Sequence, residues 1–179
     1  FKKIDNEKKA LDNISRHSHR MESEGSYKIA IQEYVEAVLY YEFVKSGKLV
    51  DLDVAAEHFV LGLSDLPGEL VRKAVFLAGK GKVDEVVKIK DEVDSIYGEL
   101  LKFDFRDNEI RRKVDAVKYD LRKLEDLVLD LIDYVEEVGE NGKLSMGDEL
   151  IIKRIAQESF TRAYSKKEEC EKNNYSWNL

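Results

Sequence analysis

Apolar residues recur every three or four positions along most of the chain, a spacing that predicts α-helices. Residues 107–138 show it most clearly, because valine and leucine form one narrow stripe while charged residues cover the remaining surface. The stripe consists of Val114, Val117, Leu121, Leu124, Val128 and Leu131. This pattern is typical of a helix that packs against neighbouring helices, and it is also compatible with an interface between subunits.

Glycines and possible capping residues divide the rest of the chain into further helices. We expect a first helix over residues 2–22, a second over 29–45, and a third that begins at a cap on Asp51 or Asp53. Pro67 either kinks that helix or starts a new one in its first turn, and Gly79 and Gly81 end it. Helices over 83–103, 107–138 and 148–171 follow, and residues 172–179 are expected to form a tail.

The composition supports an all-α fold in one domain. One proline and ten glycines leave little room for the turns that strands need. A chain of 179 residues, 43% of them hydrophobic, is long enough to bury one substantial core. We therefore predict that residues 1–179 form a single all-α domain. Its architecture would be a multi-helix antiparallel bundle of about six to seven helices.

Charge and cysteine content limit the partners and the compartment. A formal net charge of −7 argues against a surface that coats nucleic acid everywhere, so nucleic-acid binding would require a local basic patch. The chain has one cysteine, Cys170, no apolar run near the roughly 20 residues that span a bilayer, and no secretory signal pattern. We expect a cytoplasmic protein with no membrane partner.

Carboxylates interrupt the otherwise apolar stretch "IAIQEYVEAVLYYEF" at residues 29–43. Glu33 and Glu36 lie about 60° apart on one helix face, whereas Glu42 points nearly the opposite way. Two like charges in an apolar setting need either a proton or a compensating cation. That cation is a metal ion or, alternatively, a lysine or arginine of a neighbouring helix.

A second pair of acids follows in "SDLPGEL", where Asp65 and Glu69 lie about 40° apart on a helix. Together with Glu33 and Glu36, they would form an oxygen-only cage of the kind that Mg²⁺, Mn²⁺ or Ca²⁺ prefers. Alternatively, Ser64 or Asp65 caps a helix, and Glu69 lies in its first turn. No Glu-x-x-His pair, phosphate-binding loop, dinucleotide fingerprint or zinc spacing is present, so any chemistry would be metal-assisted.

Three separated motifs resemble one family. The stretches "QEYVEAV", "LGLSDLPGELVRKAV" and "RRKVDAVKYDLRKLEDLVLDL" are similar to translin and, more closely, to translin-associated factor X, in the same order over residues 27–133. The resemblance implies an all-α subunit of a closed octamer that encloses RNA, with Mg²⁺-dependent endoribonuclease activity and Mn²⁺ as a substitute. It places Glu33, Glu36, Asp65 and Glu69 as catalytic and metal-binding acids.

The resemblance also implies partners. The nucleic acid would be single-stranded RNA, a short RNA duplex or single-stranded DNA, and the assembly a homo-oligomer or a hetero-oligomer with a translin-like subunit. Residues 1–31 are shorter than the segment that usually precedes "QEYVEA" in the family, and the segment after residue 133 has no matching motif. Candidate nucleic-acid-binding residues are Arg16, His17, Arg20, Arg72, Lys73, Arg111, Arg112, Lys118 and Arg122.

Two other classes of function stay open. One is a translin-like scaffold that binds single-stranded RNA or DNA without cutting it. The other is a purely structural helical oligomer in which the acids pair with lysine or arginine. The candidate basic residues can equally belong to a solvated helix face that nearby acids balance.

Overall fold

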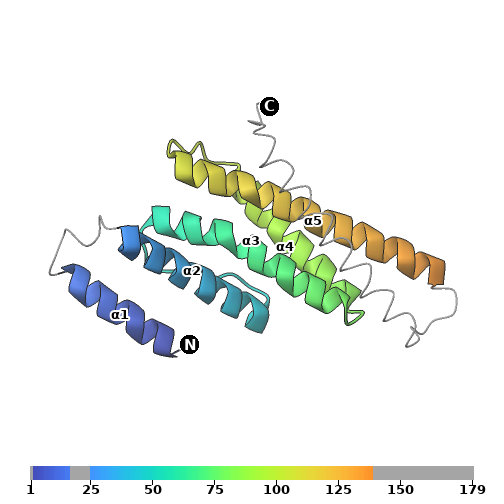
Figure 1. The fold of residues 1–179 in the computed structure, drawn as a ribbon, viewed down its shortest axis with the longest axis horizontal. Coiled ribbons are helices and arrows are strands. Elements are labelled where there is room, and N and C mark those ends of the chain that lie inside the picture. The colour runs from blue at the N-terminus through green and yellow to red at the C-terminus, as the bar shows by residue number, and fades with distance from the viewer. Residues whose placement is uncertain (1, 17–24, 139–179) are drawn as a thin grey trace. The chain divides into compact units, whose positions relative to one another are not determined.

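The computed structural model describes residues 2–16 and 25–138, which form five α-helices and no strand (Figure 1). The helices are α1 (Lys2–Arg16), α2 (Gly25–Ser46), α3 (Ala56–Ala78), α4 (Val83–Leu100) and α5 (Asn108–Val138). The predicted all-α class is confirmed. The expected helix at 148–171, the tail at 172–179 and the end of the first predicted helix lie outside the described residues.

Local chemistry explains where the helices end. Gly47 has a φ of 69°, a backbone conformation that residues other than glycine rarely adopt. Its N–H donates to the Phe43 carbonyl at 2.7 Å, and this hydrogen bond ends α2. At the start of α5, the Asp107 carboxylate accepts from the N–H groups of Glu109 and Ile110 at 2.7 and 3.1 Å. These two hydrogen bonds hold the pKa of Asp107 below its usual value.

α3 is one continuous helix with Pro67 inside it. Ser64 does not cap a helix, because its hydroxyl donates to the Val60 carbonyl one turn earlier at 2.7 Å. Asp65 and Glu69 therefore lie in the middle of α3, and the interpretation of Ser64 or Asp65 as a cap with Glu69 in the first turn was wrong. Of the two roles expected for Pro67, the structure shows the one inside a continuous helix.

The chain divides into two compact units. Unit 1 comprises Phe1–Glu69 and Glu99–Val117, and unit 2 comprises Leu70–Gly98 and Lys118–Leu179. Because α3, α4 and α5 each contribute residues to both units, the chain passes between them three times within helices. The prediction that residues 1–179 form a single domain stays a prediction.

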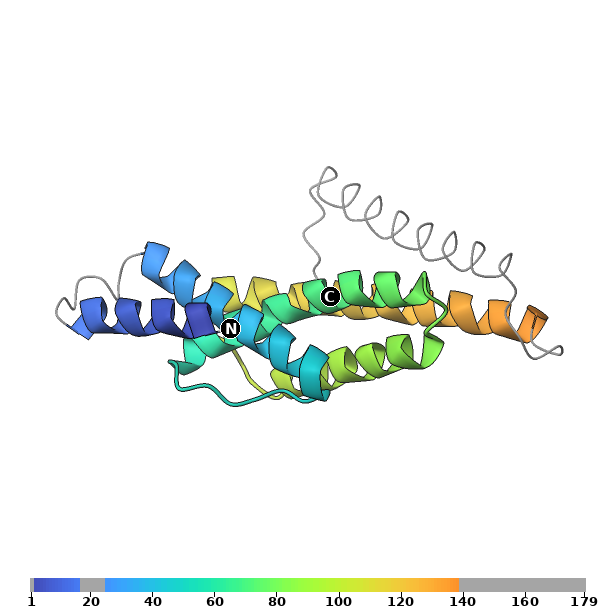
Figure 2. The same cartoon turned by 90° about the horizontal axis from the view of Figure 1, so that it is seen from below.

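In unit 1, α1 contacts α2, and α2 packs against the first half of α3 (Figures 1 and 2). The Lys8 ammonium lies 5.8 Å from the centre of the Tyr34 ring, which joins α1 to α2 by a cation–π contact. Val35 and Leu39 of α2 and Leu66 of α3 are fully buried. This apolar layer fixes the face of α2 that carries Glu36.

In unit 2, buried aliphatic residues of α3, α4 and α5 form the core. Leu70, Val86, Val93 and Leu124 are each fully buried. All six residues of the apolar stripe predicted for residues 107–138 are buried, Val114 and Val117 in unit 1 and the other four in unit 2. In the described part of the chain, no helix is both long and apolar enough to serve as a membrane span.

Candidate functional site

A close approach of two helix backbones in unit 1 positions the candidate site. Gly62 of α3 lies so near α2 that a Cβ atom placed on it would be 2.6 Å from the Val35 Cβ and 2.8 Å from the Gln32 carbonyl oxygen. Gln32, Val35 and Glu36 share one face of α2, and Asp65 lies three residues beyond Gly62. The contact at Gly62 therefore brings the Gln32–Glu36 face of α2 up to Asp65.

Asp65 has two partners from other helices. The Lys113 ammonium of α5 donates to both carboxylate oxygens, at 2.8 and 2.6 Å, and the Gln32 side-chain amide donates to one of them. The Lys113 and Asp65 side chains are 26% and 25% exposed, so the pair is largely shielded from water. Asp65 is thus already satisfied by one full positive charge and one neutral donor.

Glu36 is the most strongly perturbed carboxyl group of the cluster. Burial, followed by the negative charges of Asp65, Glu33 and Glu69, raises the pKa of Glu36 from 4.5 to about 7, although Lys113 opposes the shift. Glu33, Asp65 and Glu69 are therefore each near enough to influence Glu36.

The four acids do not form a closed cage in this arrangement. Glu33 is exposed, whereas Glu36, Asp65 and Glu69 are half-buried. Within residues 2–16 and 25–138, no three aspartate, glutamate, histidine or cysteine side chains lie close enough to hold one metal ion. Unscreened carboxylates repel one another, and Lys113 draws Asp65 to itself. The donor atoms are nevertheless all carboxylate oxygens, the ligands that hard divalent cations prefer.

Glu42 takes no part in this cluster. Its carboxylate lies 3.8 Å from the Lys45 ammonium on the same helix, a pairing typical of a partly exposed helix surface. The structure thus agrees with the prediction that Glu42 points away from Glu33 and Glu36.

Comparison with known proteins relates part of the chain to a family. Residues 51–132 match the model of the translin family, a segment that includes Asp65, Glu69 and Lys113. The structure also resembles the crystal structure of apo-NeC3PO, with a TM-score of 0.60 and 27% sequence identity over 73% of this chain and 74% of that chain. No curated protein sequence matches the chain.

Residues 51–132 therefore correspond to a translin-family domain. The resemblance stated from its three motifs is confirmed at the level of the family, which is a nucleic-acid-binding one. The family match begins after α2, so it covers the acids of α3 and not Glu33 or Glu36. A role for these two acids consequently rests on their position near Asp65 and not on the family match.

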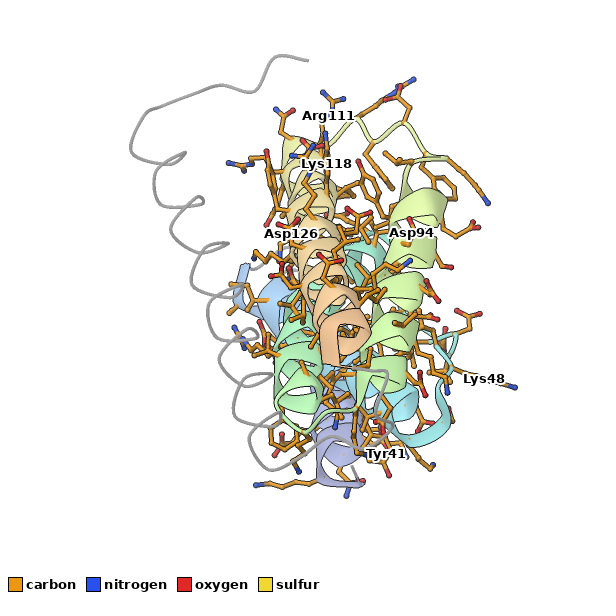
Figure 3. The ribbon with its side chains drawn as sticks, turned by 90° about the vertical axis from the view of Figure 1, so that its right-hand side faces the viewer. Tyr41, Lys48, Asp94, Arg111, Lys118 and Asp126 are labelled. Carbon is orange, nitrogen blue, oxygen red and sulfur yellow. The ribbon has the colours of Figure 1, made fainter. Side chains whose placement is uncertain are left out.

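The candidate basic residues of the translin-family domain divide by environment. Arg111 donates from Nη2 to the Phe105 carbonyl at 2.8 Å, beside the loop that precedes α5 (Figure 3), and Arg112 donates from Nε to the Asn108 carbonyl at 3.3 Å. Both nevertheless stay exposed. Arg72, Lys118 and Arg122 are exposed, and Lys73 is partly exposed. The side chain of Arg16 and the residues His17 and Arg20 lie outside what the structure describes.

The roles of Gln32 and Lys113 were not predicted from the sequence. Lys113 belongs to the basic run "RRK", but it directly precedes Val114 of the buried stripe and so lies at the edge of the packed face of α5. Gln32 directly precedes the Glu33–Glu36 pair and is only 9% exposed. A polar residue beside a predicted buried stripe is the signal that points to such partners.

Proposed function

We propose that this translin-family domain is a metal-dependent endoribonuclease of the translin-associated factor X type. The observation that carries the proposal is the set of acids around Glu36, because burial, together with the charges of Asp65, Glu33 and Glu69, raises the pKa of Glu36 to about 7. A cluster with this excess of negative charge gains stability when a divalent cation enters it. The acidic motifs, from which the sequence analysis expects a closer resemblance to the catalytic member of the family, support the same assignment.

The proposed cofactor is Mg²⁺, with Mn²⁺ as a substitute, and Glu33, Glu36, Asp65 and Glu69 would hold it. The ion would supply an activated water molecule and would neutralise charge that builds up on the scissile phosphate. Gln32 and Lys113 would orient Asp65, since both contact its carboxylate. Lys113 also places a positive charge next to the acids, which reduces their repulsion of a phosphodiester.

The proposed substrate is RNA, either single-stranded or a short duplex, and the proposed assembly is a closed oligomer, an octamer or a hetero-oligomer with a translin-like subunit. The family supports oligomer formation and nucleic-acid binding in general terms. Mainly phosphate-directed contacts would make binding tolerant of sequence and sensitive to salt. A cytoplasmic location completes the proposal, as expected for a protein with a single cysteine.

The ion pair between Lys113 and Asp65 favours a second candidate, a nucleic-acid-binding scaffold that does not cut. In that case Lys113 is the permanent counter-ion of Asp65, and the acids serve only the packing of α2, α3 and α5. The two candidates differ in whether RNA is cleaved in the presence of a divalent cation.

Labelled single-stranded and duplex RNA, incubated with the purified full chain in Mg²⁺, Mn²⁺ or EDTA, distinguishes the two. We expect sized products in Mg²⁺ or Mn²⁺ and none in EDTA. Glu36→Gln and Asp65→Asn should each lower the cleavage rate by at least about 100-fold, as expected for the loss of a group that acts in the transition state. RNA binding in EDTA and the oligomer mass should stay unchanged in both variants.

Glu42→Gln is the matched control, because Glu42 is a carboxylate of the same helix that pairs with Lys45 outside the cluster. It should cleave at the wild-type rate. Intact RNA after incubation of the wild-type chain with either metal, together with normal binding, would favour the scaffold. Wild-type cleavage by Asp65→Asn would show that the nuclease uses other residues.

A further inference from the structure

An exposed phenylalanine in unit 2 lies between two lysines. Phe76, near the end of α3, is 56% exposed, although a large apolar side chain gains stability when it is removed from water. The Lys80 ammonium lies 4.2 Å from the centre of its ring, and the Lys73 ammonium lies 5.9 Å from it. The Phe76 ring is therefore near two positive charges, one from a lysine that precedes it in the sequence and one from a lysine that follows it.

The backbone holds this arrangement in place. Lys73 and Phe76 are three residues apart on α3 and so share one face of the helix. Lys80 follows in the turn between α3 and α4 (Figure 1), where its N–H donates to the Leu77 carbonyl at 2.9 Å. The next residue, Gly81, has a φ of 70°, and its N–H donates to the Ala78 carbonyl at 2.8 Å. The turn therefore places the Lys80 ammonium over the Phe76 ring.

The surroundings of Phe76 are locally basic in an acidic protein. Residues 72–88 contain five lysines or arginines and two acids, a net charge of +3, whereas the whole chain carries −7. One of the two acids, Glu85, is already paired with Lys82 at 2.6 Å. That hydrogen bond, with further contributions from the charges of Lys73 and Lys88, holds the pKa of Glu85 below its usual value. The positive potential therefore extends over this end of unit 2.

We propose that Phe76, Lys73 and Lys80 form a contact site for single-stranded nucleic acid, in which one base stacks on the phenyl ring and the two ammonium groups bind the flanking phosphates. This site uses none of the four clustered acids, although Lys73 follows Glu69 by four residues on α3. The inference extends the proposed function, because it assumes that the chain binds nucleic acid. It does not require that the chain cuts it.

The chemistry of each group matches this ligand. Bases stack on aromatic side chains regardless of sequence, and lysine binds phosphate as a point charge. An exposed cation–π contact is weak, so the ammonium groups can leave the ring when a phosphate approaches. A base paired in a duplex cannot stack on the ring without leaving its helix, so the site favours single strands over duplexes. RNA and DNA share the stacking and phosphate chemistry.

The test measures binding of fluorescein-labelled U15 and dT15 to the full chain in EDTA over a range of salt concentrations. Phe76→Ala should weaken binding of both strands on the order of tenfold, with an unchanged slope of log affinity against log salt. Lys80→Ala should weaken binding and reduce that slope by about 0.7, the value for one lost phosphate contact on a single strand. Phe76→Trp should bind at least as tightly as wild type, whereas Phe76→Leu should resemble Phe76→Ala.

Phe103→Ala and Lys102→Ala are the controls, because Phe103 is 64% exposed and Lys102 pairs with Glu99 at 2.5 Å in unit 1. Both should bind like wild type. Full affinity of Phe76→Ala, or equal losses for U15 and for a 15-mer phosphodiester without bases, would overturn the proposal. A smaller oligomer mass of Phe76→Ala would also overturn it, since Phe76 would then contact another copy of the chain.

Failure of this proposal is distinguishable from failure of the nuclease assignment. All binding is measured without divalent cations, and cleavage is measured separately in Mg²⁺. If the wild-type chain cleaves RNA while Phe76→Ala binds normally, the nuclease proposal stands and the stacking site does not. If the wild-type chain cleaves no RNA while Phe76→Ala loses affinity for single strands, the stacking site stands and the nuclease proposal does not.

Discussion

Asp65 illustrates how a single residue acquires its properties from its neighbours. A carboxylate shielded from water is unfavourable unless it is paired and hydrogen-bonded. Lys113 and Gln32 satisfy Asp65, each from a different helix. Glu36, in contrast, lies near other carboxylates, and its raised pKa means that protonation relieves part of the unfavourable burial and repulsion of its charge. Two acids of one cluster therefore respond to the same surroundings in different ways.

The raised pKa of Glu36 predicts a pH-dependent stability difference. The pKa is about 7 in the folded chain and 4.5 as the ordinary value, so folding favours the protonated form. The stabilisation from this proton is complete below pH 4.5 and is lost as the pH rises through about 7. Glu36→Gln should therefore be more stable than wild type at pH 8, by about 1–2 kcal/mol after allowance for solvent screening, and about equal to it near pH 4.5.

Urea denaturation of both chains at the two pH values measures this difference. Glu42→Gln serves as the control, and its stability relative to wild type should not increase between pH 4.5 and 8. A Glu36→Gln variant with the same relative stability at both pH values would contradict a raised pKa in the folded chain.

At the scale of elements, the approach of α2 to α3 at Gly62 decides whether the site exists. The contact distances leave no room for a side chain, because the atoms in the way include a backbone carbonyl of α2 that cannot rotate aside. Helices that carry a glycine at their crossing can bring polar side chains within hydrogen-bonding reach of one another. Gln32 and Asp65 meet beside such a crossing.

Gly62→Ala should lower the free energy of unfolding by about 1–3 kcal/mol, as overpacking of a tight interface does, although alanine favours helix formation. It should also lower RNA cleavage, since α2 moves away from α3. Gly98→Ala is the matched control: Gly98 lies in α4, and a Cβ there would meet nothing within 4 Å. The free energy of unfolding of that variant should rise by up to about 1 kcal/mol, because alanine favours helix formation over glycine. Equal effects of both substitutions on urea denaturation would contradict the close approach at Gly62.

At the scale of the whole molecule, the distribution of charge matters more than its sum. The chain carries −7, yet it must hold a polyanion if it binds nucleic acid. A locally basic segment such as residues 72–88 would make such binding compatible with the net charge, because screened electrostatic attraction depends on charges within about one Debye length. Assembly of several copies would multiply such patches and raise the total affinity without any new contact.

We predict that the purified chain forms a closed oligomer. Light scattering after size-exclusion chromatography should give a mass about eight times that of the 20.7 kDa chain for a homo-octamer, with no larger species at higher protein concentration, because a closed ring cannot add subunits. A translin-like subunit would be required if the chain alone stays monomeric. Continuous growth of the mass with concentration would contradict closed symmetry.

Local sequence patterns determined the helical class, most helix ends and the acids worth testing. Periodicity of three and four, glycines after the helices and the charged residues between apolar ones act over a few residues, so they are visible without a fold. Lys113, 48 residues from Asp65, and the tight fit of Gly62 against α2 depend on how helices pack. Only the tertiary structure decided that Asp65 lies inside α3 and pairs with Lys113 of α5 instead of capping a helix. Burial and partner choice are properties of packing between segments distant in sequence.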